Sequence, residues 1–508
     1  MNAPANYRYI SAQRYNFTSA TNILYYENLH RQWWMNLYES APHHVWVETS
    51  LLAFIIWLVF IRKTVDPTKS ADKRKLTKSE EQMLIDSWEP EPLIPRSYVP
   101  KADNVPLVEA VNGKYIKLED STAELLNLSS FDFFGLSQNL EVKEAASKAL
   151  DKYGCGSCGP RGFYGTIDVH LEFERAIAAY MGTEEAICYS DGASAVSSEI
   201  PAFAKKGDLL LVDCACSEPV HTGICLSRAT IQFYDHNNMK ELRGIMESIA
   251  NDDRRLKRDA TQQRRWIIVE GLYRNTGKIS PLKELIALKK EFAYRLYVDE
   301  SYSFGTIGET GKGLTEHFGV HINEIDILNI SLETTLGSVG GVCVGTREVV
   351  DHQRLSGAGY CFSAAAPPYL SVVATKALSL LEHDTSYVST LRENIALFHA
   401  CLNNSNVFVP LSDQTAAIIH LNLKWQKDFE TEKEIMETCA ALCRKRHVAV
   451  AAKCELSYMK TQLRPSLRII VTSVLTKDDI KTACQVINKA FETAINNGSN
   501  VSICSGFF

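Results

Sequence analysis

Short apolar runs alternate with helix-like segments through the middle of the chain. The apolar runs are bounded by turn residues and read as buried strands: Ala186–Tyr189, Leu209–Val212, Trp266–Val269 and Leu296–Val298. Other segments carry apolar residues near helical spacing: Gln138–Tyr153, Leu171–Met181 and Pro281–Phe292. Short buried strands that alternate with helices predict an α/β fold with a mainly parallel sheet and right-handed crossovers.

The last part of the chain has a pattern of its own. Two further strands are expected at Ala416–Leu421 and Leu467–Val471, with helices near 431–446 and 477–495. This arrangement predicts a smaller α+β domain over residues 396–508, after a large domain with an N-terminal arm over residues 101–395.

A strongly apolar run precedes both domains. Leu51–Ile61 is unbroken, and it extends back to Val45 only across Glu48, Thr49 and Ser50. A membrane-spanning helix needs about 20 residues, so a short buried core helix is the alternative. No domain surrounds the run, however, and basic residues follow it: Arg62, Lys63, Lys69, Lys73, Arg74, Lys75 and Lys78. We therefore predict a single transmembrane helix over residues 45–62, with the large domains on the cytoplasmic side.

The flanking segments are of other kinds. Residues 1–44 are polar and aromatic, with Trp33 and Trp34 among them, and form a membrane-proximal segment. This segment reads either as an amphipathic helix at a membrane surface or as a partner-binding or disordered tail. Residues 63–100 carry charges and then closely spaced prolines, which favour an extended linker.

Composition excludes some classes of function. The 508 residues are 45% hydrophobic and 22% charged, ordinary values for a globular protein, and the net charge of −6 gives no nucleic-acid footprint. The 14 cysteines are scattered. Cys155 and Cys158 form a C-x-x-C, but no second pair follows at zinc spacing, so we expect reduced thiols and no metal site.

Three stretches could carry chemistry. Asp299–Glu300 directly follows an expected strand, where an acid can hold a positive ring nitrogen or simply cap a turn. Gly154–Gly165 is a glycine-rich loop whose backbone can approach a ligand closely, unless it is a surface turn. Ser190–Ser194 lies between a strand and a helical run, and could present amide groups to a phosphate.

Three further motifs belong to the same series: Glu270–Tyr273, a Gly-Gly loop at Ile330–Gly345, and Phe362–Pro368. Their order along the chain is similar to that of a known enzyme family. From about residue 100 to 495 the chain resembles the α-oxoamine synthases, pyridoxal-phosphate (PLP) enzymes of aminotransferase fold type I. The resemblance implies a seven-stranded-type sheet in the large domain. Within the family the chain is most similar to the long-chain-base subunits.

The resemblance also shows where the chain departs from the family. Asp299 matches the acid that pairs with the pyridinium nitrogen of PLP. The family His two residues after Asp-Glu is Tyr302 here, the ring-stacking His is Ser217, and the Schiff-base lysine is Thr334. No lysine occurs anywhere from 313 to 375. Because a Schiff base needs an amine, this chain is predicted to have no catalytic residue of its own and only a vestigial Asp299.

The resemblance implies a role at a shared active site. In this family each subunit contributes loops to its neighbour's cleft, and Ser363 matches the residue that reaches the PLP phosphate of the neighbouring chain. The shared cleft is expected to include Cys158, Gly159, Arg161, Tyr164 and Arg468. Arg468 matches the family's substrate-carboxylate arginine, and a structural ion pair is its alternative.

The implied function is that of a non-catalytic, membrane-anchored subunit. Its lysine-bearing partner, subunit 2, would hold PLP, and the complex would condense L-serine with palmitoyl-CoA to 3-ketosphinganine. The implied location is the endoplasmic reticulum membrane, where a small activating subunit, Orm-type regulators and membrane lipid are possible partners. Two alternatives remain: an active homodimeric synthase that uses another lysine such as Lys312, and a non-enzymatic membrane scaffold.

Overall fold

The structure is a computed structural model, and it falls into two compact units, Met1–Lys101 and Ala102–Phe508. It describes residues 35, 42–64, 77–91, 106–119, 121, 123–403, 405–453, 459 and 462–504. Most of the predicted N-terminal segment 1–44 and much of the linker 63–100 lie outside the described residues. The predicted domain boundaries at 101 and 396 stay predictions.

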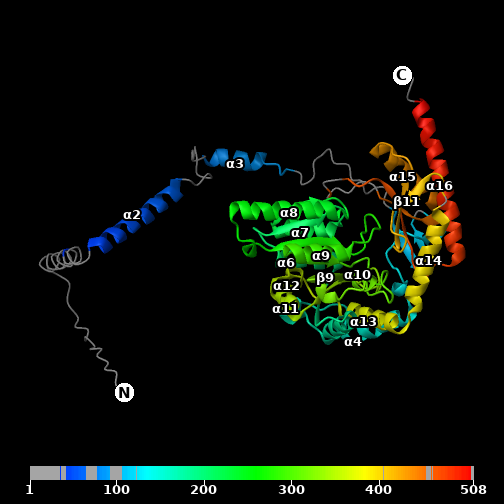
Figure 1. Cartoon of the computed structure of the whole chain (residues 1–508), viewed down its shortest axis with the longest axis horizontal. Coiled ribbons are helices and arrows are strands. Elements are labelled where there is room, and N and C mark those ends of the chain that lie inside the picture. The colour runs from blue at the N-terminus through cyan, green and yellow to red at the C-terminus, as the bar shows by residue number, and fades with distance from the viewer. Residues whose placement is uncertain are drawn as a thin grey trace, which may run out of the picture. The chain divides into compact units, whose positions relative to one another are not determined.

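Helices α2 and α3 lie in the described part of the first unit and are drawn in blue in Figure 1. Helix α2 spans Pro42–Thr64, and its described apolar side chains from Trp46 to Val59 are exposed. Helix α3 spans Lys78–Ser87 and starts at a capping box in which Thr77 and Glu80 bond each other's backbone N–H groups.

The transmembrane helix predicted over 45–62 is not supported. In the described part of the chain, no helix combines the length and the apolar character that a bilayer crossing requires. The apolar run within α2 is short for a span, because Glu48, Thr49 and Ser50 interrupt it before Leu51.

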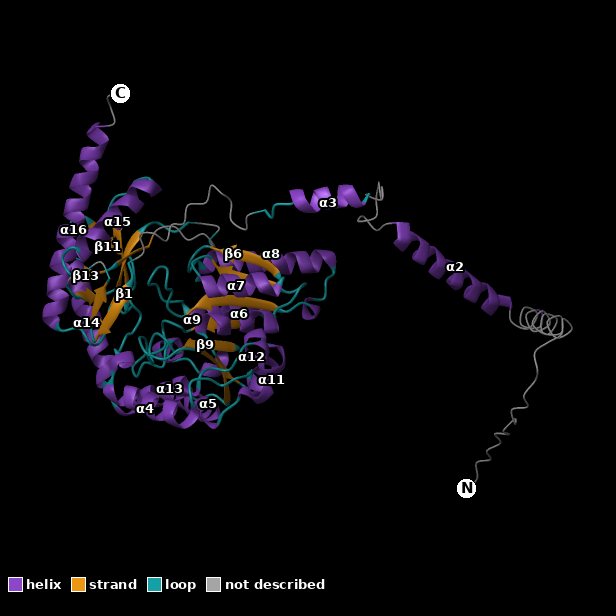
Figure 2. Ribbon diagram, turned by 180° about the vertical axis from the view of Figure 1, so that it is seen from behind, coloured by secondary structure: helices purple, strands orange, loops and turns teal. Residues whose placement is uncertain are grey.

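A seven-stranded sheet is the centre of the second unit (Figure 2). Its strands are β4 (Glu185–Tyr189), β5 (Leu209–Asp213), β6 (Thr230–Tyr234), β7 (Arg265–Glu270), β8 (Arg295–Asp299), β9 (Ile327–Ser331) and β10 (Gly341–Gly345). They lie in the order β4-β10-β9-β8-β7-β5-β6, and only β10 runs antiparallel to its neighbours. The predicted, mainly parallel seven-stranded sheet is therefore confirmed.

Helices cover this sheet. They are α4 (Leu140–Tyr153), α5 (Asp168–Met181), α6 (Gly192–Phe203), α7 (Glu218–Ser227), α8 (Met239–Leu256), α9 (Leu282–Phe292), α10 (Leu314–Phe318), α11 (Arg347–Ser356), α12 (Ala358–Phe362) and α13 (Pro368–His383). Figure 2 shows α4, α5 and α13 together at one end, and α13 packs against both of the other helices. Three of these helices begin at a side-chain N-cap: Asn139 caps α4, Asp191 caps α6 and Asn238 caps α8. The helices predicted at 138–153, 171–181 and 281–292 are confirmed.

Two four-stranded sheets complete the unit. One has the order β1-β2-β3-β13: β1 (Val108–Asn112), β2 (Tyr115–Leu118), β3 (Leu125–Asn127) and β13 (Val448–Ala449). The other has the order β11-β12-β15-β14: β11 (Phe408–Pro410), β12 (Ile418–Leu423), β15 (Ser466–Ile470) and β14 (Ala451–Lys453). Helices α14 (Ser386–Leu402) and α15 (Phe429–Arg444) pack against α16 (Lys477–Cys504).

The pairing of β3 with β13 was not predicted. It joins a strand near residue 126 to one near residue 448, so both ends of the unit contribute to the same sheet.

Candidate functional site

The carboxylate of Asp299 lies at the end of β8, and one of its oxygens is bonded by its own chain. Its Oδ1 accepts hydrogen bonds from the backbone N–H of Ser301 (3.0 Å), the Ser301 hydroxyl (2.5 Å) and the side-chain amide of Asn329 (2.9 Å). Asn329 stands opposite Asp299 in the β8–β9 register. Burial raises the pKa of Asp299. The predicted acid is thus in place, held by two neighbours that the sequence did not single out.

A second buried carboxyl, Glu270, lies beside it at the end of β7. One Glu270 oxygen accepts a hydrogen bond from the backbone N–H of Ser217, and the other accepts one from that of Arg274 (3.2 Å). Burial, together with the charge of Asp299, raises the pKa of Glu270 to about 8. Ser217 itself sits at the start of α7, where it offers a small hydroxyl side chain in place of the ring that would stack on a cofactor.

Thr334 is buried at the position of the expected lysine. Its hydroxyl donates a hydrogen bond to the carbonyl of Ser301 (2.6 Å), and its own carbonyl accepts one from the backbone N–H of Phe133 (2.9 Å). Lys312, the alternative lysine, places its ammonium 4.9 Å from the centre of the Tyr180 ring. Thr334 therefore ties the Gly-Gly loop to the Asp299 turn, and has no amine to offer.

Tyr302 and Arg468 meet around Phe131. The Tyr302 and Phe131 ring centres are 4.9 Å apart, and the guanidinium carbons of Arg468 and Arg274 lie 4.8 and 5.5 Å from the Phe131 centre. Burial, with the charge of Arg274, lowers the pKa of Arg468 to about 10. The Nε of Arg468 is buried and finds no hydrogen-bond partner among the residues that the structure describes. Its neighbours are therefore aromatic and cationic, which does not support the structural ion pair.

The glycine-rich loop 154–165 packs against the segment that carries Ser363. The carbonyl of Gly159 accepts a hydrogen bond from the backbone N–H of Ala365 (2.8 Å), and the Ser157 hydroxyl donates to the Ala365 carbonyl (2.7 Å). The loop turns so tightly that a Cβ on Gly165 would lie 1.9 Å from the Gly159 carbonyl oxygen. Glycine at 165 is thus required by the close approach of the backbone.

A buried ion pair anchors this loop. The guanidinium of Arg161 makes two hydrogen bonds to the carboxylate of Glu174 on α5, at 2.8 and 3.0 Å. The Arg161 guanidinium carbon also lies 5.3 Å from the centre of the Tyr360 ring of α12. Arg161 is therefore a buried anchor and not an exposed cleft residue, which refines its predicted place.

The outer side of the loop is exposed and apolar. Phe163, Tyr164 and Phe362 are 70%, 92% and 85% exposed. Cys158 and Tyr164 both adopt the left-handed backbone region, with φ of 59° and 64°. We call Cys158, Phe163, Tyr164, Phe362 and the half-buried Ser363 the loop face. The structure thus brings the predicted residues Cys158, Gly159, Tyr164 and Ser363 together, while their role stays a prediction.

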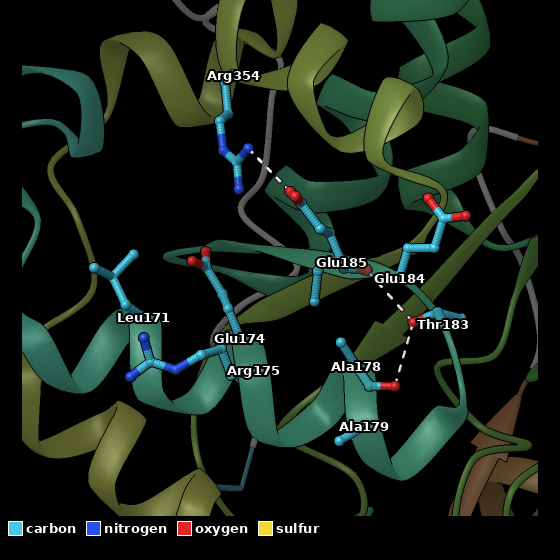
Figure 3. Close-up of a pocket in the computed structure, with 10 residues that line it drawn as sticks. Leu171, Glu174, Arg175, Ala178, Ala179, Thr183, Glu184, Glu185 and Arg354 are labelled. Atoms are coloured by element: carbon cyan, nitrogen blue, oxygen red, sulfur yellow. Dashed lines mark hydrogen bonds and ion pairs between the residues drawn. The ribbon is translucent and has the colours of Figure 1, made fainter.

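Other candidate features lie elsewhere. A pocket of about 490 Å³ is lined by Glu174, Arg175, Glu185 and Arg354 among others, and it contains none of the predicted site residues (Figure 3). Cys155 and Cys158 are free and exposed thiols. In the ranges that the structure covers, no cluster of His, Cys, Asp or Glu has the makings of a metal site.

The start of α6 departs from the phosphate site expected at Ser190–Ser194. The helix begins there as predicted, but the side chain of Asp191 accepts the hydrogen bond of the Ser194 N–H (2.7 Å). The residues present at the expected positions do not fit PLP: Thr334 offers no amine, Ser217 offers no ring, and the carboxylate of Asp191 takes the Ser194 N–H that a phosphate would use. Sequence reasoning missed the cap, although an Asp before a helical run is a known signal for one.

The sequence as a whole matches a known family. The family model for aminotransferase class I and II matches residues 123–487. The chain belongs to this family.

Among its curated relatives is serine palmitoyltransferase 1 of Dictyostelium discoideum, 36% identical over 491 residues that cover 93% of this chain and 98% of the relative. Long chain base biosynthesis protein 1b of Oryza sativa subsp. japonica is 38% identical over 439 residues, 86% of this chain and 89% of the relative. A solved structure of SPT with a PLP internal aldimine superposes with a TM-score of 0.67 at 24% identity, covering 77% of this chain and 93% of that one. This last likeness confirms the type I fold.

Proposed function

We propose that this chain is the non-catalytic subunit of a heterodimeric serine palmitoyltransferase. The complex condenses L-serine with palmitoyl-CoA to 3-ketosphinganine, in the synthesis of sphingolipid long-chain bases. Curated relatives named serine palmitoyltransferase 1 and long chain base biosynthesis protein 1 support this reading over most of the chain. PLP is the cofactor of the complex, and the lysine-bearing partner subunit holds it.

One observation carries the proposal. At the position where the family has its Schiff-base lysine, Thr334 is buried and its hydroxyl is committed to the Ser301 carbonyl at 2.6 Å. A hydroxyl cannot form an imine or act as the amine base that PLP chemistry needs. The residue that would react is thus replaced by one that fastens two loops of this chain together.

The loop face gives the chain something to offer a partner. It exposes two aromatic rings and Tyr164 in a backbone conformation that costs about 1 kcal/mol or more for a residue other than glycine. Exposed aromatic residues are typical of the centre of protein–protein interfaces. We therefore propose that this face contacts the catalytic subunit, with Ser363 directed to the phosphate of the partner's PLP.

The test against an active homodimer uses the purified chain alone. Incubate it with PLP, reduce with borohydride, and map any pyridoxyl group by peptide mass spectrometry. We expect no labelled peptide from this chain, while the lysine-bearing partner serves as the positive control. A stoichiometric label on Lys312 or any other lysine of this chain, together with activity in the absence of the partner, would establish the homodimeric synthase instead.

The test against a scaffold role uses affinity purification from detergent-solubilised membranes. We expect a lysine-bearing homologue to co-purify in equal amount, and synthase activity to require both chains. Activity of the homologue that is the same with and without this chain would favour the scaffold.

The shared cleft is tested with Cys158→Ala and Ser363→Ala in the complex. We expect a raised KM for serine or a changed amino-acid selectivity, although the substituted side chains belong to the subunit that we propose to be non-catalytic. Cys225→Ala, at another exposed thiol, is the matched control for the cysteine. Unchanged kinetics in both site variants would contradict the proposal.

We also propose that the chain works at the endoplasmic reticulum membrane, with the large unit in the cytoplasm. The support is the exposed apolar surface of α2, which fits contact with a membrane surface, and the basic residues that follow it, which attract anionic lipids. A small activating subunit and Orm-type regulators are the accessory partners that we propose. Cell fractionation of the full chain and of a variant without residues 42–64 tests this: the variant should leave the membrane fraction.

A further inference from the structure

The start of α6 is a natural anion site that this chain fills itself. The first N–H groups of a helix lack partners within the helix, and the helix dipole favours negative charge there. Helix α6 begins at Gly192 and runs for 12 residues. The helix follows β4, and its first residue faces the Gly-Gly loop. The phosphate site expected from the sequence at Ser190–Ser194 lies here.

Asp191 takes one of these donors. Its Oδ1 accepts the Ser194 N–H at 2.7 Å and forms the N-cap of the helix. An aspartate at this position brings a negative charge to the donors that a phosphate would need.

Glu333, next to Thr334 on the Gly-Gly loop, brings a second carboxylate to the same place. A Cβ added to Gly192 would lie 3.6 Å from Glu333 Oε1, 3.1 Å from the Ser331 hydroxyl and 3.3 Å from the Gly340 carbonyl oxygen. The loop thus lies directly on the first residue of the helix. The Ser331 hydroxyl accepts the Glu333 backbone N–H (3.3 Å), which fixes the turn that directs the side chain.

The charges around Glu333 fit an occupied anion site. Partial burial, then the charge of Asp191, raises the pKa of Glu333, while the backbone N–H groups of Gly192 and Gly340 lower it. The Glu333 side chain is exposed, and its carboxylate lies near these backbone N–H groups and near the negative charge of Asp191. Space is short as well, since a Cβ on Gly341 would lie 2.4 Å from the Ala195 side chain.

We propose that the carboxylate of Glu333 occupies the anion site at the start of α6 and keeps the phosphate of PLP out of this chain. The proposal rests on the proposed function, in which PLP belongs to the partner, and it adds a second barrier beside the missing lysine. Restoring the amine alone does not restore a cofactor site. The complex thereby holds PLP on one side only.

The experiment compares three forms of this chain, each co-expressed with its partner: Thr334→Lys, Glu333→Ser/Thr334→Lys, and the control Glu348→Ser/Thr334→Lys. Glu348 is an exposed glutamate on α11. Each complex is incubated with PLP and reduced with borohydride, and the pyridoxyl group on the peptide that carries position 334 is quantified.

We expect roughly ten-fold more label on the Glu333→Ser double variant than on the other two, the size of a favourable helix-terminus interaction. Equal labelling of all three would overturn the proposal, because the carboxylate would then be no barrier. Absence of label on all three would overturn it too, since removal of the carboxylate would not open the site.

A second measurement needs no new lysine. Inorganic phosphate should raise the melting temperature of a Glu333→Gln complex more than that of the wild-type or a Glu348→Gln complex, because Gln keeps the shape and removes the charge. Equal shifts in all three complexes would contradict the proposal. Labelling of the wild-type chain would defeat the proposed function itself, so the two failures are distinguishable.

Discussion

Two regions of the large unit differ in how far their side chains are contacted by the chain itself. Around Asp299, Glu270 and Thr334, each named carboxyl or hydroxyl has a hydrogen-bond partner from this chain. On the loop face, aromatic side chains are exposed and two residues hold a left-handed backbone. In the first region the named carboxyls and hydroxyls are bonded by this chain, although the buried Asn329 Oδ1 has no hydrogen-bond partner among the described residues. In the second region aromatic side chains are exposed.

This difference shows which parts of a chain with Thr334 at the expected lysine position are left open to a partner. Buried polar groups are stable only when paired, and around Asp299 and Thr334 this chain supplies partners itself. Backbone strain and exposed aromatic side chains are typical of functional surfaces, and contact with a partner subunit is one such function. The predictions below test each side of this contrast.

The largest effect is expected at the anchor of the loop face. Arg161→Met leaves the buried carboxylate of Glu174 without its cation, which should lower the free energy of unfolding by about 3–5 kcal/mol. Urea denaturation measures this, with Arg175→Met as the control, because Arg175 is the adjacent exposed residue on α5. A loss no larger than that of the control would mean that the pair does not anchor the loop.

A smaller, pH-dependent effect is expected at Glu199, a buried carboxyl near Asp299. Burial raises the pKa of this carboxyl from 4.5 to about 8, and its Oε2 accepts the Tyr297 hydroxyl at 2.8 Å. Below about pH 4.5 it is protonated in both states. Between 4.5 and 8 only the unfolded state ionises, so the free energy of unfolding falls as the pH rises, and it levels off above 8.

Glu199→Gln removes the ionisable group and with it this pH dependence of the free energy of unfolding. Melting curves at several pH values should show the variant gaining on the wild type by up to a few kcal/mol, on the order of the shift, between pH 5 and 8. Glu247→Gln, at an exposed site on α8, should follow the wild type. A constant difference between Glu199→Gln and the wild type would show that the carboxyl does not titrate in this range.

Thr334→Val should cost about 1 kcal/mol of unfolding free energy, because it removes one buried hydrogen bond. Thr335→Val, which removes the bond to the Phe304 carbonyl at 2.7 Å, should cost about the same. The activity per folded complex should not change in either. A selective loss of turnover in Thr334→Val would give Thr334 a role in the reaction.

The smallest change in stability, with the opposite sign, is expected at Tyr164→Gly. Glycine relieves the left-handed backbone at φ 64°, so the free energy of unfolding should stay level or rise by less than about 1 kcal/mol. Co-purification of the partner should nevertheless fall. Arg228→Gly, at another exposed left-handed residue, supplies the control in which the partner is retained. Full retention by both variants would remove Tyr164 from the interface.

The sequence determined the elements and the departure from the family, because both are local. Periodicity located β4, β5, β7, β8 and the helices α4, α5 and α9, but not α7 or α8. The identity of residue 334 alone excludes an imine at that position. The sequence misjudged the apolar run near residue 51, since hydrophobicity marks a helix there but not its fitness to cross a bilayer.

Only the tertiary structure decided which groups satisfy the buried carboxyls and which surface is left open. Asn329 reaches Asp299 because β9 pairs with β8, and Ala365 reaches Gly159 because the chain returns through α12. The approach of Glu333 to Gly192 depends in the same way on the meeting of β10 with β4. Hydrogen bonds between residues far apart in the chain follow from strand order, which no local pattern encodes.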